Sequence, residues 1–276
     1  MGKESKMKRI IGVNSNCYHG FSIDDAIDGI KAAGFQYIEL TATKGWTEHV
    51  FPSQSFSELI RIKSKLKAND LIPFAMSGHC NLMDQERVSD FIANIELAAF
   101  FGCSYIVSSI GEAHLEDKTI LSNREVARSI KALVPILEEK KIKLVLETHG
   151  DHGTGVILKE IVNYINSEWV SINYDTANVI FYGNVDIKQD LSACMDQVGY
   201  MHLKDKDGAV KEWNFPALGE GKVDFPMIFE MLGEKSNPCP FSIEIEFTQD
   251  GPKNLEEVNR AVKSSYDYLV HQGFEI

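Results

Sequence analysis

Three carboxylates and one imidazole stand at the ends of four apolar stretches in the second half of the chain. Each stretch has the length and composition of a buried strand, and they end on Glu147, Asp175, His202 and Glu244. If the strands are parallel neighbours in a barrel, their carboxyl ends share one rim, and the four side chains can point at a common centre. Such a ligand set suits Mn²⁺, Co²⁺ or Mg²⁺, with Zn²⁺ possible. The sequence therefore predicts one bound divalent metal ion.

Each of these residues, taken alone, has a simpler explanation. A carboxylate or histidine at a strand end often caps a loop or forms a hydrogen bond at the surface. Four successive strand ends of the same kind favour a shared ion instead. Glu246 lies on the same strand face as Glu244, so either glutamate can supply the fourth ligand.

Strands and helices that alternate along the chain would position these residues. Apolar runs predict strands over residues 9–14, 37–40, 72–76, 104–108, 142–146, 169–174, 198–201 and 241–246. Amphipathic segments predict helices over residues 22–34, 56–68, 85–101, 123–139, 156–165, 187–195, 225–232 and 255–269. Ser22 is the expected N-cap of the first helix, and Gly34 is expected to end it.

This alternation predicts a single (β/α)8 TIM barrel, because an open doubly wound sheet usually stops at about five to seven strands. Nothing in the composition divides the chain, so one domain over residues 1–276 is expected. No GxGxxG motif follows the first strand, which argues against dinucleotide binding.

The composition is that of an acidic globular protein. Twenty-eight Lys and Arg against 40 Asp and Glu give a net charge of −12, which argues against nucleic acid or an anionic membrane as a partner. The basic start, Lys3 to Arg9, precedes an apolar run too short for a signal peptide or a membrane span, so a cytoplasmic location is expected. Five scattered cysteines without a CxxC pair predict neither a disulfide framework nor a thiolate zinc site.

The order and spacing of several motifs resemble the xylose isomerase-like TIM-barrel superfamily, the sugar phosphate isomerase/epimerase group. The resemblance covers nearly the whole chain, and its main motifs are Glu147-Thr-His149-Gly, Tyr174-Asp175-Thr-Ala-Asn178, His202-Leu-Lys204-Asp205, Leu218-Gly-Glu220-Gly221 and Ser242-Ile-Glu244-Ile-Glu246. In ketose 3-epimerases of this group, the matching Glu, Asp, His and Glu bind one divalent ion. The resemblance therefore implies that Glu147, Asp175, His202 and Glu244 are metal ligands, with Glu244 preferred to Glu246.

The activity implied by the resemblance is isomerisation or epimerisation of a ketose or keto-sugar. In these epimerases the two glutamates exchange protons with the substrate, a catalytic role that falls here on Glu147 and Glu244. A divalent ion would polarise the substrate carbonyl and hold the enediolate formed when a neighbouring proton is removed. The substrate is expected to be a small carbohydrate that contacts His79, His149, Lys204, Trp213 and Glu246.

Some of these residues have a second interpretation. His79 can be a hydrogen-bonded rim histidine, and Lys204 can pair with Asp205 instead of substrate. Trp213 can anchor its loop instead of stacking on a sugar. Glu39, at the end of the second strand, is expected either to bond a substrate hydroxyl or to cap a loop.

The chain also departs from the epimerases. The epimerases carry a His at the position of Asn178 and an Arg at the position of Gly208. The His-x-Lys-Asp segment resembles inosose dehydratases, so a metal-dependent lyase is the second expectation, with Lys204, Glu246 or His149 as the acid.

Other members of the superfamily suggest further alternatives. The apurinic endonuclease branch would need more histidines at the barrel rim than this chain offers and a cationic surface. The net charge of −12 argues against it. A catalytically inactive sugar-binding protein is the fourth alternative. No Lys/Arg cluster marks the last two strand-end loops, which favours an unphosphorylated substrate. Barrels of this group often form dimers or tetramers, so a homo-oligomer is possible.

Overall fold

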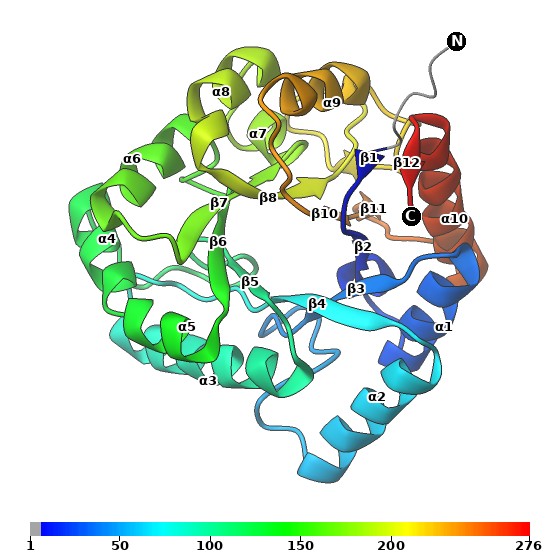
Figure 1. Cartoon of the computed structure of the whole chain (residues 1–276), viewed down its shortest axis with the longest axis horizontal. Helices are drawn as coiled ribbons and strands as arrows, with labels where there is room; N and C mark the ends of the chain where they lie inside the picture. The colour runs from blue at the N-terminus through cyan, green and yellow to red at the C-terminus, as the bar shows by residue number, and fades with distance from the viewer. Residues whose placement is uncertain (1–6) are drawn as a thin grey trace.

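Eight parallel strands closed into a barrel form the centre of the computed structural model, which describes residues 7–276 (Figure 1). The barrel strands are β2 (Ile11–Asn14), β3 (Tyr37–Thr41), β4 (Ile72–Ser77), β5 (Tyr105–Ser108), β6 (Lys143–Glu147), β7 (Val170–Asp175), β8 (Val198–Leu203) and β10 (Phe241–Ile243). The last strand closes the ring, because Phe241 of β10 pairs with Ile11 of β2. The predicted TIM barrel is confirmed.

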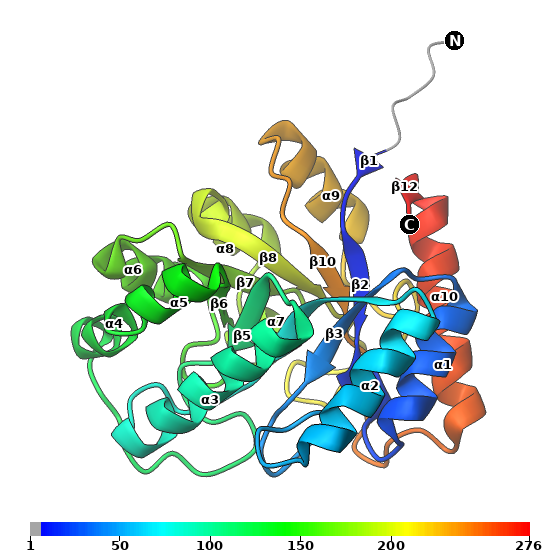
Figure 2. The same ribbon diagram turned by 60° about the horizontal axis from the view of Figure 1, so that its bottom comes forward.

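Helices cover the outside of the barrel (Figures 1 and 2). They are α1 (Ile23–Ala33), α2 (Phe56–Ala68), α3 (Gln85–Phe101), α4 (Asn123–Lys131), α5 (Val134–Lys140), α6 (Gly155–Ile165), α7 (Asn178–Phe181), α8 (Ile187–Cys194), α9 (Phe225–Glu234) and α10 (Leu255–His271). Among residues 7–276, every helix is too short or too polar to cross a lipid bilayer. Residues 3–6 of the basic start lie outside the described part of the chain.

The ends of α1 illustrate how local sequence sets the boundaries. The Ser22 side chain accepts a hydrogen bond from the Asp25 backbone N–H, and the Asp25 carboxylate accepts one from the Ser22 N–H. This reciprocal arrangement satisfies two free N–H groups at the helix start. Gly34 follows the helix with a φ of 113°, a conformation that favours glycine. Both predicted boundaries are confirmed.

Two predicted elements differ from the structure. The segment 123–139 is two helices, α4 and α5, because Pro135 lacks the N–H that a continuous helix would need there. The eighth barrel strand ends at Ile243 instead of residue 246, because the chain turns away to form β11 (Phe247–Thr248). Glu244 and Glu246 therefore lie in the segment between these two strands.

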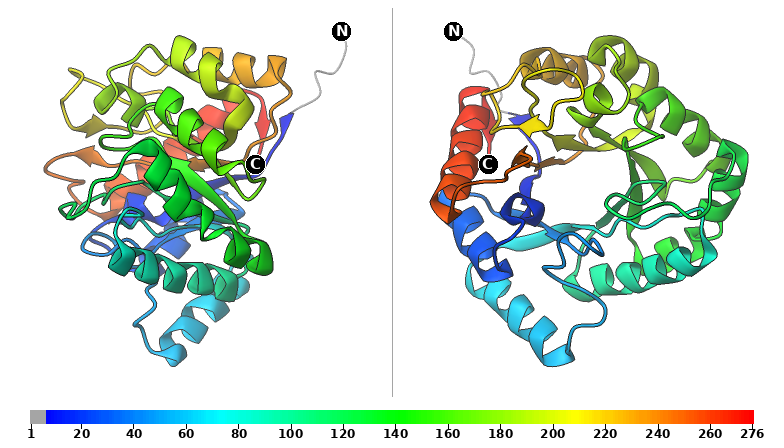
Figure 3. Two further views of the ribbon diagram at one scale, coloured as in Figure 1. Left: turned by 90° about the vertical axis from the view of Figure 1, so that its left-hand side faces the viewer. Right: turned by 180° about the vertical axis from the view of Figure 1, so that it is seen from behind.

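Two short sheets lie outside the barrel. β11 pairs antiparallel with β9 (Asn214–Phe215) and so joins the loop that follows β10 to the loop that follows β8. β1 (Met7–Lys8) pairs with β12 (Phe274–Glu275) beside the C-terminal helix. Figure 3 shows the helical layer from two further sides, with β11 in orange next to the long connecting loops.

The barrel interior changes from apolar to polar along its axis. A cluster of Phe74, Ala75, Val107, Val145 and Tyr200 forms an apolar floor. Because strand side chains alternate, residues two positions further along β6 and β8 point into the same interior. Those positions are Glu147 and His202, so the apolar floor lies directly below the predicted metal ligands.

Candidate active site

The four predicted metal ligands meet at the carboxyl end of the barrel. Each offers one ligand atom from Glu147, Asp175, His202 or Glu244, and these atoms all lie within 4.8 Å of one another. The His202 Nδ1 atom is 3.5 Å from Glu147 Oε2, 3.8 Å from Asp175 Oδ2 and 3.6 Å from Glu244 Oε2. All four residues are buried. The structure thus brings together residues that are almost 100 positions apart in the chain.

These residues fit a divalent cation. Glu147 Oε2, Asp175 Oδ2 and His202 Nδ1 are buried and have no hydrogen-bond partner among the described residues. A buried polar atom without a partner is costly, and such atoms are rare in folded proteins. Here three of them surround one point, with three carboxylates and one imidazole nitrogen as donors. This cluster could bind a metal ion.

Glu39 holds the His202 ring in the orientation that metal binding needs. His202 Nε2 lies 3.0 Å and 3.1 Å from the two oxygens of Glu39, which also accepts a hydrogen bond of 2.7 Å from the Tyr200 hydroxyl. Burial lowers the pKa of His202, but Glu39 and Glu147 outweigh that effect and raise it well above its usual value. The Glu39 carboxylate keeps one imidazole proton on Nε2, so a cation would replace the proton on Nδ1. Neither predicted role for Glu39 is correct, because the side chain is fully buried below the pocket.

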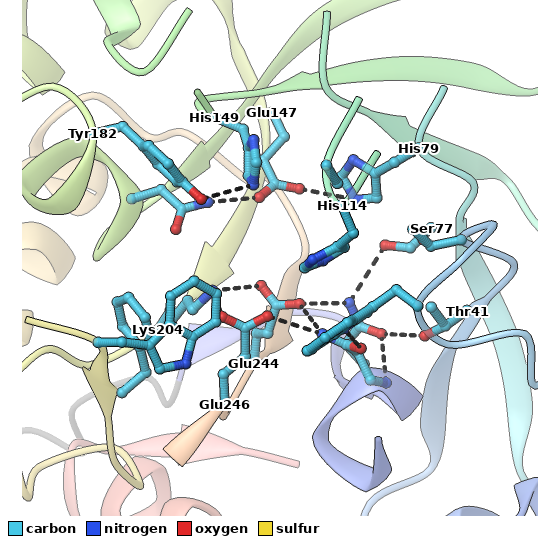
Figure 4. Close-up of a pocket in the computed structure, with 18 residues that line it drawn as sticks. Thr41, Ser77, His79, His114, Glu147, His149, Tyr182, Lys204, Glu244 and Glu246 are labelled. Carbon is cyan, nitrogen blue, oxygen red and sulfur yellow. Dashed lines mark hydrogen bonds and ion pairs between the residues drawn. The ribbon is translucent and has the colours of Figure 1, made fainter. Parts of the chain in front are cut away.

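Polar side chains orient Glu147 on one side of the pocket (Figure 4). Asn178 Nδ2 donates to Glu147 Oε1 at 2.8 Å, and His79 Nε2 lies 3.3 Å from Glu147 Oε2. His79 Nδ1 accepts the backbone N–H of Ser109 at 3.0 Å, and the contact of its Nε2 with Glu147 Oε2 does not have hydrogen-bond geometry. His79 thus lines the pocket as predicted.

A buried lysine lies on the other side of the pocket. Lys204 Nζ is 2.6 Å from Glu246 Oε2 and 3.4 Å from Glu244 Oε2. The alternative pairing of Lys204 with Asp205 is wrong, because Asp205 accepts the backbone N–H groups of a nearby loop. The ambiguity between the two glutamates is also reduced, since Glu244 belongs to the four-residue cluster whereas Glu246 is the closer partner of Lys204.

Negative charge dominates this site. Burial raises the pKa of Asp175 well above its usual value, and the nearby charges of Glu147 and Glu244 raise it further. Burial also raises the pKa of Glu246, although Lys204 opposes this shift. For Glu147, the effect of burial is outweighed by His202 and His79, which lower its pKa below the usual range. A divalent cation would relieve the repulsion among these carboxylates.

The pocket wall contains the remaining predicted substrate contacts. His149 lines the pocket and its Nε2 lies 3.2 Å from the Tyr182 hydroxyl, and burial lowers the pKa of His149 to about 4. Trp213 also lines the pocket, and its ring packs against Phe215 with centroids 5.1 Å apart. All five predicted substrate residues, His79, His149, Lys204, Trp213 and Glu246, therefore border one pocket.

Several pocket residues were not predicted as site residues. Asn16 donates to Glu244 Oε1 at 3.1 Å and to Glu246 Oε1 at 3.2 Å, and Asn14 donates to Glu244 Oε1 at 3.3 Å. Asn14 and Ser77 each end a barrel strand, so the strand-end pattern could have revealed both. Tyr182 and His114 belong to segments between strands, where the sequence contains no periodic signal for their position.

Comparison with known proteins agrees with this architecture. A family model described as xylose isomerase-like TIM barrel matches residues 27–265. The L-ribulose-5-phosphate 3-epimerase UlaE of Shigella flexneri serotype 5b is 27% identical over 154 residues, which are 55% of this chain and 53% of that protein. The chain thus spans only about half the length of such curated relatives.

Solved structures share the whole fold at low identity. A D-allulose 3-epimerase from Methylomonas sp., in complex with D-allulose, has a TM-score of 0.74 and 17% identity, over 98% of this chain and 99% of that one. The IOLI protein with a binding zinc atom has a TM-score of 0.77 and 18% identity, over 97% of this chain and 100% of that one. Because the family model matches most of its length, the chain belongs to the xylose isomerase-like TIM barrel family.

Proposed function

We propose that this protein is a divalent-metal-dependent sugar epimerase or isomerase that acts on a ketose or keto-sugar. The observation that carries the proposal is the set of unpartnered ligand atoms of Glu147, Asp175 and His202 that surround one point beside Glu244. The epimerase names of a sequence relative and of a structural neighbour support the same class of reaction. Mn²⁺, Co²⁺ or Mg²⁺ is the proposed ion, with Zn²⁺ as the alternative.

The two glutamates are the proposed acid–base pair. When bound, the metal ion would supply a positive charge that polarises the substrate carbonyl and acidifies the neighbouring C–H. Glu147 and Glu244 reach the pocket from two sides (Figure 4). Glu147, held by Asn178, and Glu244, held by Asn14 and Asn16, would remove a proton from one face of the substrate carbon and return one to the other.

The remaining pocket side chains would bind and orient the sugar. His79 and His149 offer ring nitrogens beside Glu147, and Lys204 and Glu246 offer a charged pair beside Glu244. Trp213 offers an aromatic surface at the outer end of the pocket. A cytoplasmic location and a homo-oligomeric state stay predictions from the sequence.

A dehydratase is the second candidate function. The observation in its favour is the buried Lys204 Nζ, 2.6 Å from Glu246 Oε2, since such a pair can protonate a departing hydroxyl group. Loss of water and epimerisation begin with the same proton removal, so product analysis separates them. A product lighter by one water molecule would identify the lyase.

The test measures proton exchange between solvent and sugar. The Mn²⁺-loaded protein is incubated in D₂O with single ketoses, including D-fructose and D-allulose, and deuterium at the carbon next to the carbonyl is followed by NMR. Glu147→Gln and Glu244→Gln are each expected to keep the fold and lose at least about 100-fold in exchange rate, the lower range for acid–base catalysis.

Metal content must be measured in the same samples, because both glutamates are also proposed ligands. A variant that holds its ion and has lost exchange supports the proton-transfer role. Full exchange in either variant would remove the two-base mechanism. If His202→Ala and the unmodified protein both lack metal after equilibration with Mn²⁺, the proposed metal dependence is wrong.

A further inference from the structure

The inner pocket adjoins a second, wider cavity that we call the vestibule. Counting the space at their open mouths, the inner pocket has about 430 Å³ and the vestibule about 1370 Å³ of empty volume. Asn16, Trp46, His114, Trp213 and Glu246 border both cavities. A molecule that reacts at Glu147 and Glu244 would therefore lie beside the vestibule.

One wall of the vestibule is a stack of three rings. Trp46 lies between His19 and His114, with ring centroids 3.7 Å and 4.0 Å away and the rings within 9° of parallel. The Trp46 Nε1 donates to Asn16 Oδ1 at 2.9 Å, which fixes the indole edge. Burial lowers the pKa of His19 and lowers that of His114 to about 3, so the stack is uncharged at neutral pH. The stack is an aromatic wall beside the inner pocket.

A second wall comes from the small sheet of β9 and β11. Phe247 of β11 lines the vestibule and pairs with Phe215 of β9, whose ring contacts Trp213. Phe247 has a φ of 59°, a conformation that bulky side chains rarely adopt. Backbone strain of this kind is often found at ligand sites, where surrounding contacts maintain it. Here the pairing of the two strands holds the aromatic side chain at the vestibule.

The charges argue against an anionic group in either cavity. No Lys or Arg lines the vestibule among the residues that the structure describes, while the carboxylates of Glu246 and Asp250 do. The one lysine in the inner pocket, Lys204, already contacts Glu246 and Glu244. A phosphate group in the vestibule would meet negative charge and no free cation.

The vestibule also offers hydrogen-bonding groups beside its aromatic surfaces. Thr248 and Gln249 line it and are exposed, and Asn16 lies where the two cavities join. Both faces of Trp46 are covered by the imidazoles of His19 and His114, so the stack offers ring edges and outer imidazole faces. Aromatic groups next to polar side chains suit a ligand that has both C–H surfaces and hydroxyl groups. A neutral sugar ring has this combination, whereas a purely apolar group would leave the polar side chains unpaired.

We infer that the substrate is an uncharged sugar of two rings. The inference rests on the proposed function, because the first sugar unit is the ketose whose open-chain carbonyl form reacts between Glu147 and Glu244. The second ring, joined to it by a glycosidic bond, occupies the vestibule between the Trp46 stack and Phe247. The protein would thus select glycosylated ketoses over both free and phosphorylated ketoses.

The experiment compares ligands that share one ketose. Isothermal titration calorimetry on the Mn²⁺-loaded protein is performed with D-fructose, D-fructose 6-phosphate and three glucosyl-fructoses with a free ketone, namely maltulose, leucrose and isomaltulose. At least one disaccharide is expected to bind about tenfold more tightly than D-fructose, which corresponds to about 1.4 kcal/mol. The phosphate ester is expected to bind no more tightly than D-fructose. Equal affinities for all the neutral sugars, or tighter binding of the phosphate ester, would overturn the inference.

Two matched variants locate the second ring. Gln249→Trp adds bulk at an exposed position of the vestibule, and it should abolish the preference for the disaccharide. Gln85→Trp makes the same change at the exposed start of α3, outside both cavities, and should keep the preference. An unchanged preference in Gln249→Trp would place the second ring elsewhere and refute the assignment.

Deuterium exchange separates failure of this inference from failure of the proposed function. Exchange into D-fructose without a preference for disaccharides would contradict the two-ring substrate and leave the epimerase proposal standing. A Gln249-dependent preference without exchange into any of these ketoses would support the vestibule assignment and contradict the epimerase.

Discussion

Glu39 is the residue whose role depends most on the fold. It stands at the bottom of the site, where it accepts hydrogen bonds from Tyr200 and contacts Nε2 of His202. In Glu39→Gln, the new amide N–H₂ can donate to Nε2 and move the imidazole proton to Nδ1. We expect the affinity for Mn²⁺ to fall about 10- to 100-fold, the usual effect of losing such a partner, as measured by calorimetric titration.

Tyr200→Phe is the control for this prediction. It removes one hydrogen bond to Glu39 but leaves the contact between Glu39 and His202 in place. Its loss of metal affinity should be clearly smaller. If Glu39→Gln binds Mn²⁺ as tightly as the unmodified protein, the imidazole orientation does not depend on this carboxylate.

Lys204 is the counter-charge for two glutamates. Lys204→Met leaves the buried Glu244 and the largely buried Glu246 side chain without that charge. We expect the free energy of unfolding in metal-free buffer to decrease by about 3–5 kcal/mol, as for other broken buried ion pairs. Urea denaturation followed by circular dichroism measures this change.

The double variant Lys204→Met/Glu246→Gln tests the origin of that loss. Because it removes one of the uncompensated carboxylates, it should recover part of the stability. A double variant less stable than Lys204→Met would mean that packing, and not charge, explains the effect.

The sequence predicts individual site residues only where a strand ends on them. Glu147, Asp175 and His202 each follow an apolar run, and the closed barrel makes their positions neighbours. Asn16 and Trp46 depend on how loops fold over the barrel, which periodicity does not describe. The contact between Asn16 and Glu244, 228 positions apart, is a property of the closed ring.

At the scale of elements, Asp205 organises the loop after β8. Its two carboxylate oxygens accept the backbone N–H groups of Gly219, Gly221 and Val223 at 2.9–3.1 Å. Asp205→Asn directs an N–H₂ group at one or more of these donors. We expect the free energy of unfolding to fall by about 1–3 kcal/mol, the range for buried polar groups left unsatisfied, as measured by urea denaturation.

Asp207→Asn provides the same chemical change at an exposed position. Asp207 pairs with Lys222, and both side chains are largely exposed, at 41% and 72%. Surface ion pairs are screened by water and contribute little, so this variant should remain close to the unmodified protein in stability. Equal losses of unfolding free energy in the two variants would show that the buried hydrogen bonds of Asp205 stabilise the protein no more than the exposed contact of Asp207 does.

Elements with strong local signals were predictable to within two residues, and weaker ones were not. The helices α2 and α3 begin and end where their apolar spacing and flanking residues predict. The break between α4 and α5 could have been predicted from Pro135, although the apolar periodicity continues across it and does not reveal it. The early end of β10 could not, because the competing partner of its continuation is β9, about 30 residues earlier in the chain.

At the scale of the whole molecule, the proposed metal site would join four neighbouring strand ends on one side of the barrel. Its ligands come from β6, β7 and β8 and from the segment after β10, and β10 is the strand that closes the ring onto β2. Without a cation, the carboxylates repel one another inside the fold, and this repulsion is absent when the chain unfolds. An ion that binds only the folded barrel must therefore stabilise the whole domain.

We expect Mn²⁺ at about 100 times its dissociation constant to raise the free energy of unfolding by about 2.7 kcal/mol over the value in EDTA. His202→Ala should lose most of this increase, because it removes the one nitrogen ligand. His271→Ala, on the exposed end of α10, makes the same substitution far from the cluster in sequence and should retain the increase. Urea denaturation with and without metal measures all three proteins. If metal raises the free energy of unfolding of His202→Ala as much as that of the unmodified protein, the stabilising ion binds outside the four-residue cluster. If only His202→Ala loses this increase, the ion binds at the four strand ends.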